Sequence, residues 1–322
     1  MSQKKYDVTA LGEILIDFTF AGVTESGTRL FEQNPGGAPA NVLSAVTRLG
    51  GKTAFIGKIG KDMHGEFLRD TLAANGIDAR ALKETDGAFT TLAFVALDEK
   101  GDRSFSFARK PGADTQLRAD ELDEETVASS KIFHVGSLSL TDEPARSATL
   151  SALHIAKQNG LMISYDPNYR AGLWSSREAA VEGMKLPLPF VDMIKISDEE
   201  GVLLTGEASA EGAAKFFLEA GISCVLVTMG EKGAYVAGRA GAVYSPAFAS
   251  DVVDTTGAGD SFMGAFLYRV ACCGKHPREL STKELADFAR FANAAAALCV
   301  GRRGGINAMP ELAEVEALLA RC

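Results

Sequence analysis

The stretch Asp254-Thr255-Thr256-Gly257-Ala258-Gly259-Asp260 decides how this chain is expected to fold and to act. An extended, turn-bounded run precedes it at residues 247–253, and in the residues that follow, 261–270, apolar side chains recur at helical spacing. The glycines are therefore predicted to lie in a loop that opens a helix. Small residues let backbone N–H groups surround an anion, and the first helical turn adds positive potential. The stretch thus predicts a phosphate-binding loop.

The last residue of the stretch, Asp260, is unusual beside an anion site. A carboxylate there repels a resting phosphate, but it is useful if it collects a proton from a hydroxyl that attacks the phosphate. The alternative is an ordinary turn, in which Asp254 or Thr256 caps the helix and Asp260 complements its dipole. The density of threonine, glycine and aspartate in seven positions favours the chemical interpretation. The loop is neither a Walker A sequence nor a Rossmann fingerprint.

Composition narrows the class of protein. The chain has 322 residues, 46% of them hydrophobic, which suffices for a large core. Its net charge of −9 argues against a general role at nucleic acid or membrane surfaces, but not against ATP binding. No apolar run approaches the roughly 20 residues that span a bilayer, and the first residues lack the apolar segment of a signal peptide. The cysteines show no ligand spacing, so we expect reduced core thiols in a cytoplasmic protein: Cys224, Cys272, Cys273, Cys299 and Cys322.

A second glycine segment lies early in the chain, at residues 35–41, and precedes apolar residues at helical spacing that end near Gly50. Gly36 and Gly37 would let a ligand approach the backbone, and Asn41 can bond a hydroxyl. An ordinary loop-to-helix turn explains the segment equally well. Upstream, the run from Tyr6 to Phe20 is predicted to be a strand with a turn-like Gly12-Glu13 inside it. Asp17 interrupts its apolar residues, which by itself favours a polar residue on an edge strand over a ligand for hydroxyls.

A polar turn at residues 98–102 separates two β-rich runs, 89–97 and 103–109, and predicts a hairpin. Together with the first strand and the segment at 29–33, the hairpin is expected to form a small sheet apart from the main body. Such a sheet over a cleft would act as a lid that keeps water from a transferring phosphate. The lid strands are therefore expected within about 13–34 and 88–110.

From residue 130 onward, strand and helix patterns alternate. This rhythm predicts a single α/β domain over 1–322, with a mostly parallel, doubly wound sheet flanked by helices. Ligands of such sheets gather at the carboxyl ends of the strands. Polar or glycine residues follow several predicted strands, at Asp166, Asn168, Arg170, residues 195–200, Thr228 and Gly230.

Taken together, these motifs resemble the ribokinase-like carbohydrate kinases of the PfkB family, and among them most resemble fructokinases. The resemblance runs nearly end to end. Its most specific parts are PGGAPAN at 35–41 and DTTGAGD at 254–260. Supporting matches are the segments around Gly12 and Asp17, AFIGKIG at 54–60, FSFARKPGAD at 105–114, SYDPNYR at 164–170, KISDEE at 195–200, VTMGEKG at 227–233 and FANAAAA at 291–297.

The resemblance implies a role for each matching position. Asp260 would be the catalytic base, and the anion hole would be formed by Gly257, Ala258 and Gly259. Substrate contacts would come from Asp17, Gly36, Gly37, Asn41, Arg109 and Arg170. Nucleotide contacts would come from Asn168, Lys195, Ser197, Thr228, Gly230 and Asn293. Glu200 would organise magnesium indirectly, and Asp254 and Thr256, with carbonyls at 299–308, would match a monovalent-cation loop.

The resemblance also implies the reaction and its partners: an ATP- and Mg²⁺-dependent sugar kinase, activated in some members by K⁺. D-fructose phosphorylated at the 6-hydroxyl is the expected substrate and reaction. The alternatives in the same fold are 2-keto-3-deoxygluconate, an aminoimidazole riboside and ribose, and a relative that binds nucleotide or a partner without catalysis is a further one. Ser197 and Ala108 depart from the family, standing where members often carry asparagine and an aromatic residue. Homodimerisation through the lid is a further expectation.

Overall fold

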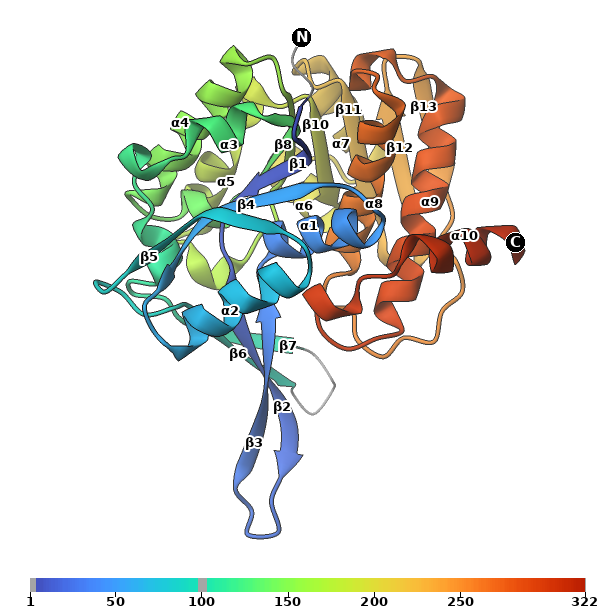
Figure 1. Cartoon of the computed structure of the whole chain (residues 1–322). Helices are drawn as coiled ribbons and strands as arrows, with labels where there is room; N and C mark the ends of the chain where they lie inside the picture. The colour runs from blue at the N-terminus through green and yellow to red at the C-terminus, as the bar shows by residue number, and fades with distance from the viewer. Residues whose placement is uncertain (1–3, 98–102, 322) are drawn as a thin grey trace.

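The fold is that of a computed structural model, which describes residues 4–97 and 103–321. A nine-stranded sheet forms the body, in the order β13-β12-β11-β10-β9-β8-β1-β4-β5 (Figure 1). Its strands are parallel from β5 to β11, and the edge hairpin β12–β13 is antiparallel. The strands are β1 (Tyr6–Leu11), β4 (Thr53–Gly60), β5 (Asp78–Thr85), β8 (Ser130–Gly136), β9 (Met162–Asp166), β10 (Met193–Ser197), β11 (Cys224–Thr228), β12 (Ala234–Gly238) and β13 (Gly241–Ser245).

Helices cover both faces of this sheet, because alternate residues of its buried strands enter two different hydrophobic clusters. In β11, Cys224 and Leu226 join one cluster, whereas Val225 and Val227 join the other. The first cluster packs against α1 (Ala38–Arg48), α2 (Met63–Ala74), α8 (Ala258–Cys273), α9 (Thr282–Val300) and α10 (Leu312–Arg321). The second packs against α3 (Glu124–Ala128), α4 (Ala145–Gln158), α5 (Arg177–Lys185), α6 (Asp198–Thr205) and α7 (Ala210–Glu219). The predicted doubly wound α/β fold is confirmed.

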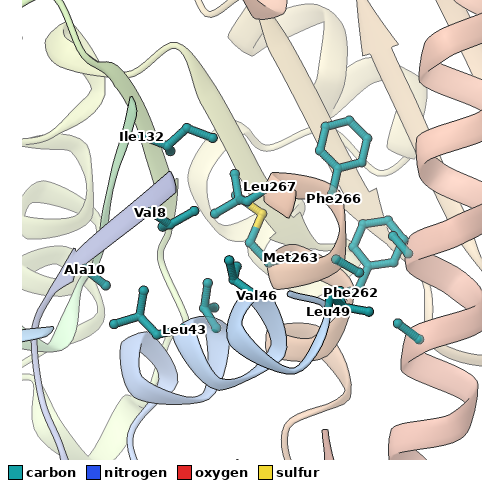
Figure 2. Packing of buried hydrophobic residues seen from close by; sticks show 14 of the residues in the cluster. Val8, Ala10, Leu43, Val46, Leu49, Ile132, Phe262, Met263, Phe266 and Leu267 are labelled. Carbon is teal, nitrogen blue, oxygen red and sulfur yellow. The ribbon is translucent and has the colours of Figure 1, made fainter. Parts of the chain in front are cut away.

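The helices α1 and α8 lie against each other and against the centre of the sheet. Figure 2 shows Leu43 and Val46 of α1 and Met263 of α8 gathered beside Val8 of β1. The two helices approach closely at Gly264, where a Cβ atom would lie 2.5 Å from the Ala45 Cβ and 2.6 Å from the Val42 carbonyl oxygen. Only glycine fits this crossing, so the close packing fixes the distance between α1 and α8 at this point.

The predicted lid is a separate four-stranded sheet in the order β3-β2-β6-β7. It consists of β2 (Leu15–Val23), β3 (Arg29–Gly36), β6 (Leu92–Leu97) and β7 (Arg103–Ala108). The β2–β3 hairpin projects away from the body (Figure 1). The expected turn at 98–102 lies outside the described residues, but β6 and β7 on either side of it are antiparallel neighbours, as a hairpin requires.

Four details differ from the sequence prediction. The strand-like run from Tyr6 to Phe20 is divided between two sheets, because the chain leaves β1 after Leu11 and enters the lid at Leu15. The extended run at 247–253 forms no strand, and Val252 there is 63% exposed. The edge hairpin β12–β13 was not predicted. Among the cysteines, Cys224 and Cys299 are buried free thiols, as expected, but Cys272 is exposed.

Candidate active site

A cavity of about 620 Å³ lies at the carboxyl ends of the parallel strands, between the body and the lid. The lid contributes Leu15, Asp17 and Phe107 to its lining. The body contributes the starts of α1 and α8 and the segments that follow β9 and β10: Gly37, Ala38, Asn41, Asn168, Tyr169, Arg170, Lys195, Ser197, Glu199, Glu200, Thr255, Thr256, Gly257, Gly259 and Asp260. The early and late glycine segments, far apart in the sequence, therefore wall one cavity.

The glycine loop turns directly into α8. Gly257 is the N-cap residue and has a left-handed backbone, with φ of 79°, which glycine adopts without strain. A Cβ atom on Gly259 would lie 2.8 Å from the Lys195 Nζ, so a side chain here would displace that ammonium group. Within residues 4–97 and 103–321, no protein acceptor is recorded for the backbone N–H groups of Gly257, Gly259 or Asp260. Free amides at a helix start, beside a lysine, suit an anion such as a nucleotide phosphate.

Asp260 lies in the first turn of α8 and is buried, with 6% of its surface exposed. The side-chain amide of Asn41 donates to its Oδ2 at 2.7 Å, and that of Asn168 donates to its Oδ1 at 3.4 Å. Burial and the nearby carboxylate of Asp166 raise the pKa of Asp260 to about 6, against the opposing effects of Asn41, Lys195 and Arg170. A carboxylate with such a pKa is ionised at neutral pH and is a stronger base than an exposed aspartate.

A buried ion pair between Lys195 and Asp166 lies close to Asp260. Lys195 of β10 donates to the Asp166 Oδ2 at 3.0 Å, and 7% and 1% of the two residues are exposed. Burial alone would lower the pKa of Lys195, but Asp166, Glu200 and Asp260 together raise it, so the amine stays charged. The pair keeps a positive charge beside the glycine loop.

Both carboxylate oxygens of Glu200 accept hydrogen bonds from backbone N–H groups. Its Oε1 accepts from the Tyr169 backbone N–H at 2.6 Å, and its Oε2 accepts from the Ser197 N–H at 2.8 Å. The Ser197 hydroxyl in turn accepts from the Glu200 N–H at 3.1 Å, which completes a capping box at the start of α6. No group of three or more histidine, cysteine or acidic residues that could hold a metal ion occurs in the described part of the chain.

A polar link joins the glycine loop to the loop near the C-terminal end of the chain. The Asp254 carboxylate accepts from the Thr256 N–H at 2.8 Å and from the Gly304 N–H at 3.1 Å. Gly305 lies close as well, since a Cβ atom on Gly257 would be 3.2 Å from its Cα. These contacts bring together the two segments that the sequence resemblance pairs at a monovalent-cation loop.

The cavity lining does not include every residue predicted for the site. The Arg109 guanidinium is buried in an ion pair with Asp114, at 2.6 Å, and borders a second cavity instead. The Asn293 amide donates to the Ser245 carbonyl at 2.9 Å, and the Thr228 hydroxyl donates to the Ile196 carbonyl at 3.3 Å. Gly36, Thr228, Gly230, Asp254, Ala258 and Asn293 likewise lie outside the lining. Their proposed roles stay predictions.

Sequence reasoning missed two acidic side chains. Glu13 lines the cavity, although only 2% of it is exposed, and its Oε1 accepts from the Ala38 N–H at 3.0 Å. Asp166 was noted only for its place after a strand, and its pairing with Lys195 was not foreseen. The signal available for both was an acidic residue at the carboxyl end of an apolar strand.

The fold and the site are those expected of a phosphotransferase: a glycine loop opens a helix, a buried carboxylate follows in its first turn, and a lid walls the same cavity. A family model described as pfkB family carbohydrate kinase matches residues 5–312. The chain belongs to this family of carbohydrate kinases.

Relatives and solved structures cover nearly the whole chain. Fructokinase-1 of Zea mays is 43% identical over 98% of this chain and 98% of its own. A crystal structure of fructokinase with bound ATP from Xylella fastidiosa superposes with a TM-score of 0.91 at 34% identity, covering 98% of this chain and 99% of that one. The fructokinase of Vibrio cholerae O395 in its fructose-, ADP- and calcium-bound form gives a TM-score of 0.87 at 34% identity, over 97% and 98% of the two chains.

Proposed function

We propose that this protein transfers the γ-phosphoryl group of ATP to the 6-hydroxyl of D-fructose, giving fructose 6-phosphate and ADP. The observation that carries the proposal is the position of Asp260, which lies buried beside free backbone N–H groups in a cavity that the lid also walls. The similarity to fructokinases over nearly the full chain supports fructose as the acceptor.

Phosphoryl transfer is largely a matter of positioning and charge stabilisation, through a loose transition state. Asp260 accepts the proton of the attacking hydroxyl as that oxygen bonds to the γ-phosphorus and the bond from the γ-phosphorus to the departing ADP oxygen breaks. The N–H groups of Gly257, Gly259 and Asp260 and the Lys195 ammonium stabilise the negative charge of the terminal phosphate. The Asn41 and Asn168 amides hold the Asp260 carboxylate in place during the transfer.

The glycine cradle fits ATP, because a Cβ atom at Gly259 would fill the space beside Lys195. Magnesium in phosphoryl-transfer sites is bound mostly by phosphate oxygens and water, with one or two carboxylates, and it neutralises charge on the phosphates. Glu199 and Glu200 line the cavity and would hold such an ion through water. For K⁺, the candidate ligands are Asp254 and Thr256, with carbonyls in the neighbouring loop at 299–308.

The substrate is tested by measuring ADP release with fructose, ribose, 2-keto-3-deoxygluconate and an aminoimidazole riboside at matched concentrations. Turnover highest with fructose supports the proposal, and highest turnover with another sugar replaces fructose as substrate. Equal background with every sugar would instead support a relative without catalysis. Coupling to phosphoglucose isomerase and glucose-6-phosphate dehydrogenase identifies the position, since fructose 6-phosphate yields NADPH and fructose 1-phosphate does not.

The remaining expectations concern ions and assembly. Activity measured in K⁺ and in Na⁺ at equal ionic strength tests the cation loop, with higher turnover expected in K⁺. The described chain contains no helix with the length and apolarity needed to cross a bilayer. We place the enzyme in the cytoplasm as a homodimer that pairs through the outer face of its lid. Light scattering of the purified protein tests the dimer.

A further inference from the structure

Helix α1 lacks a capping side chain of its own. Its N-cap residue is Gly37, which has φ of 112° and makes no side-chain cap hydrogen bond. Glu13, in the connection between β1 and β2, supplies the missing acceptor, because its Oε1 accepts from the Ala38 N–H at 3.0 Å. An acceptor at this position satisfies one of the free N–H groups at the helix start, and a negative charge there complements the helix dipole.

The segment at residues 12–13 and the start of α1 at residues 37–39 are in close contact at this cap. A Cβ atom on Gly37 would lie 2.5 Å from the Glu13 carbonyl oxygen, and one on Gly12 would lie 2.6 Å from the Pro39 Cγ. Contacts this close require glycine on both sides. A change at Glu13 is therefore transmitted directly to the first turn of α1.

That first turn carries the strongest hydrogen-bond donor to the base. The Asn41 backbone N–H donates to the Gly37 carbonyl at 2.9 Å, and the Asn41 side-chain amide donates to the Asp260 Oδ2 at 2.7 Å. We propose that Glu13 is a positioning residue that completes the cap of α1 and thereby holds Asn41 against the base Asp260. This inference rests on the proposed role of Asp260 in the kinase reaction.

The cap persists whichever way Glu13 titrates. Burial and the nearby Asp114 raise the pKa of Glu13 to about 7, against the opposing effects of backbone hydrogen bonds and of Arg109. A protonated carboxyl still has one carbonyl-type oxygen, which accepts from the Ala38 N–H as the carboxylate does. A glutamine at this position keeps that oxygen, whereas an alanine removes it.

The test measures the pKa of Asp260 from the pH profile of kcat, in which the acid limb is the range where kcat falls as the pH is lowered. The charged groups facing Asp260 are Asp166, Lys195 and Arg170, and none of them is altered in the variants used here. Loss of the Asn41 donor would raise the pKa of Asp260, since that hydrogen bond lowers it in the intact protein. For Glu13→Ala, the acid limb is expected to move to higher pH by roughly one unit, while the KM for ATP stays within about twofold.

Two further variants separate positioning from a general loss of structure. Glu13→Gln keeps the acceptor oxygen and should restore the wild-type acid limb. Ser209→Ala removes the N-cap of α7, where the Ser209 hydroxyl accepts from the Gly212 N–H at 3.0 Å. It should lower thermal stability as a lost cap does, without moving the acid limb.

A double-mutant cycle with Asn41→Leu decides the route. If Glu13 acts through Asn41, then Glu13→Ala shifts the acid limb in the wild-type background but not in the Asn41→Leu background. Equal shifts in both backgrounds, or no shift in either, would overturn the inference. Should Glu13→Ala fold poorly, Glu13→Leu fills the same space without an acceptor oxygen, and the Asp260 carboxyl is titrated by ¹³C NMR in Glu13→Leu and in Glu13→Gln. A raised pKa in only Glu13→Leu supports the inference, and no shift in either variant overturns it. If the wild-type protein shows no sugar-dependent turnover, the proposed function fails, and the NMR titration still tests the Glu13 contact.

Discussion

The body and the lid wall the same cavity, but they hold their polar groups in different ways. On the body side, buried groups are paired with one another before any substrate binds, as Lys195 is with Asp166 and Asn41 is with Asp260. The lid strand β2 instead passes from buried Leu15 to Val23, which is 59% exposed. The difference shows that the polar groups of the body are already paired within the protein, whereas the lid leaves apolar side chains exposed. We therefore propose that the lid acts through what it contacts, the sugar on one face and a second chain on the other.

The largest effect is expected in the body, for Asp260→Asn. The amide cannot accept the hydroxyl proton, so kcat should fall by about 10²–10⁴-fold, the range of a general base. Because the ionised form of Asp260 is disfavoured by burial, the neutral variant should be at least as stable as the wild type. Steady-state kinetics and thermal unfolding at pH 8 measure both quantities. Near-normal turnover would remove Asp260 from the mechanism.

Lys195→Met tests whether the body is held together by its own charges. The change leaves Asp166 buried without its partner, and the free energy of unfolding should drop by about 3–5 kcal/mol. Urea denaturation at pH 8 measures the loss. Lys61→Met is the matched control, because Lys61 pairs with Asp86 at the surface, where such a pair contributes about 1 kcal/mol or less. Similar losses in the two variants would contradict the distinction between buried and exposed pairs.

Asp17→Asn tests the acceptor side of the lid. If the Asp17 carboxylate binds sugar hydroxyls, the KM for fructose should rise by roughly 10–100-fold, the cost of one or two hydrogen bonds to a charged group. The KM for ATP should change little, because the proposed phosphate site lies on the body side. Glu32→Gln, on the neighbouring strand β3, is a control at an exposed position. A parallel rise in both KM values would show that the lid does not act on the sugar alone.

The smallest effect on the folded chain is expected on the outer face of the lid. Phe20 and Phe31 are 42% and 41% exposed and pack edge to face. Phe31→Ser should change the unfolding free energy of the monomer by only about 0.5 kcal/mol, as for other surface substitutions. It should nevertheless shift the mass measured by light scattering from dimer toward monomer. An unchanged mass, or a monomeric wild type, would remove the lid from the assembly.

The sequence predicted those parts of the molecule that depend on local signals. The glycine segments at 35–41 and 254–260 predicted the starts of α1 and α8 correctly, because helix starts are determined by nearby residues. The edge strands β12 and β13 were not predicted because alanine and glycine, which are uncommon in strands, make up much of each. The run at 247–253 has strand-like residues but no strand beside it to pair with, so propensity alone misled.

Local sequence patterns could not predict the side-chain contacts of the site. Asn41 and Asp260 are 219 residues apart, and spacing does not show that one amide points at the other carboxylate. Arg109 was expected at the substrate, yet its guanidinium pairs with Asp114, a partner five residues away that the pattern did not single out. The role of Glu13 depends on burial and on the bare cap at Gly37, both of which require the folded arrangement.

The crossing at Gly264 affects how this enzyme tolerates amino-acid substitutions. A Cβ atom on Gly264 would lie only 2.5 Å from the Ala45 Cβ, so accepting a methyl group there requires α1 and α8 to move apart by about an ångström to reach normal contact distance. The hydrophobic interior has enough contacts to survive such a wedge, but the amide of one helix and the acid of the other would separate by a similar amount. We therefore expect variants at Gly264 that still unfold cooperatively but have lost kinase activity. A screen that measures only expression would not detect this loss.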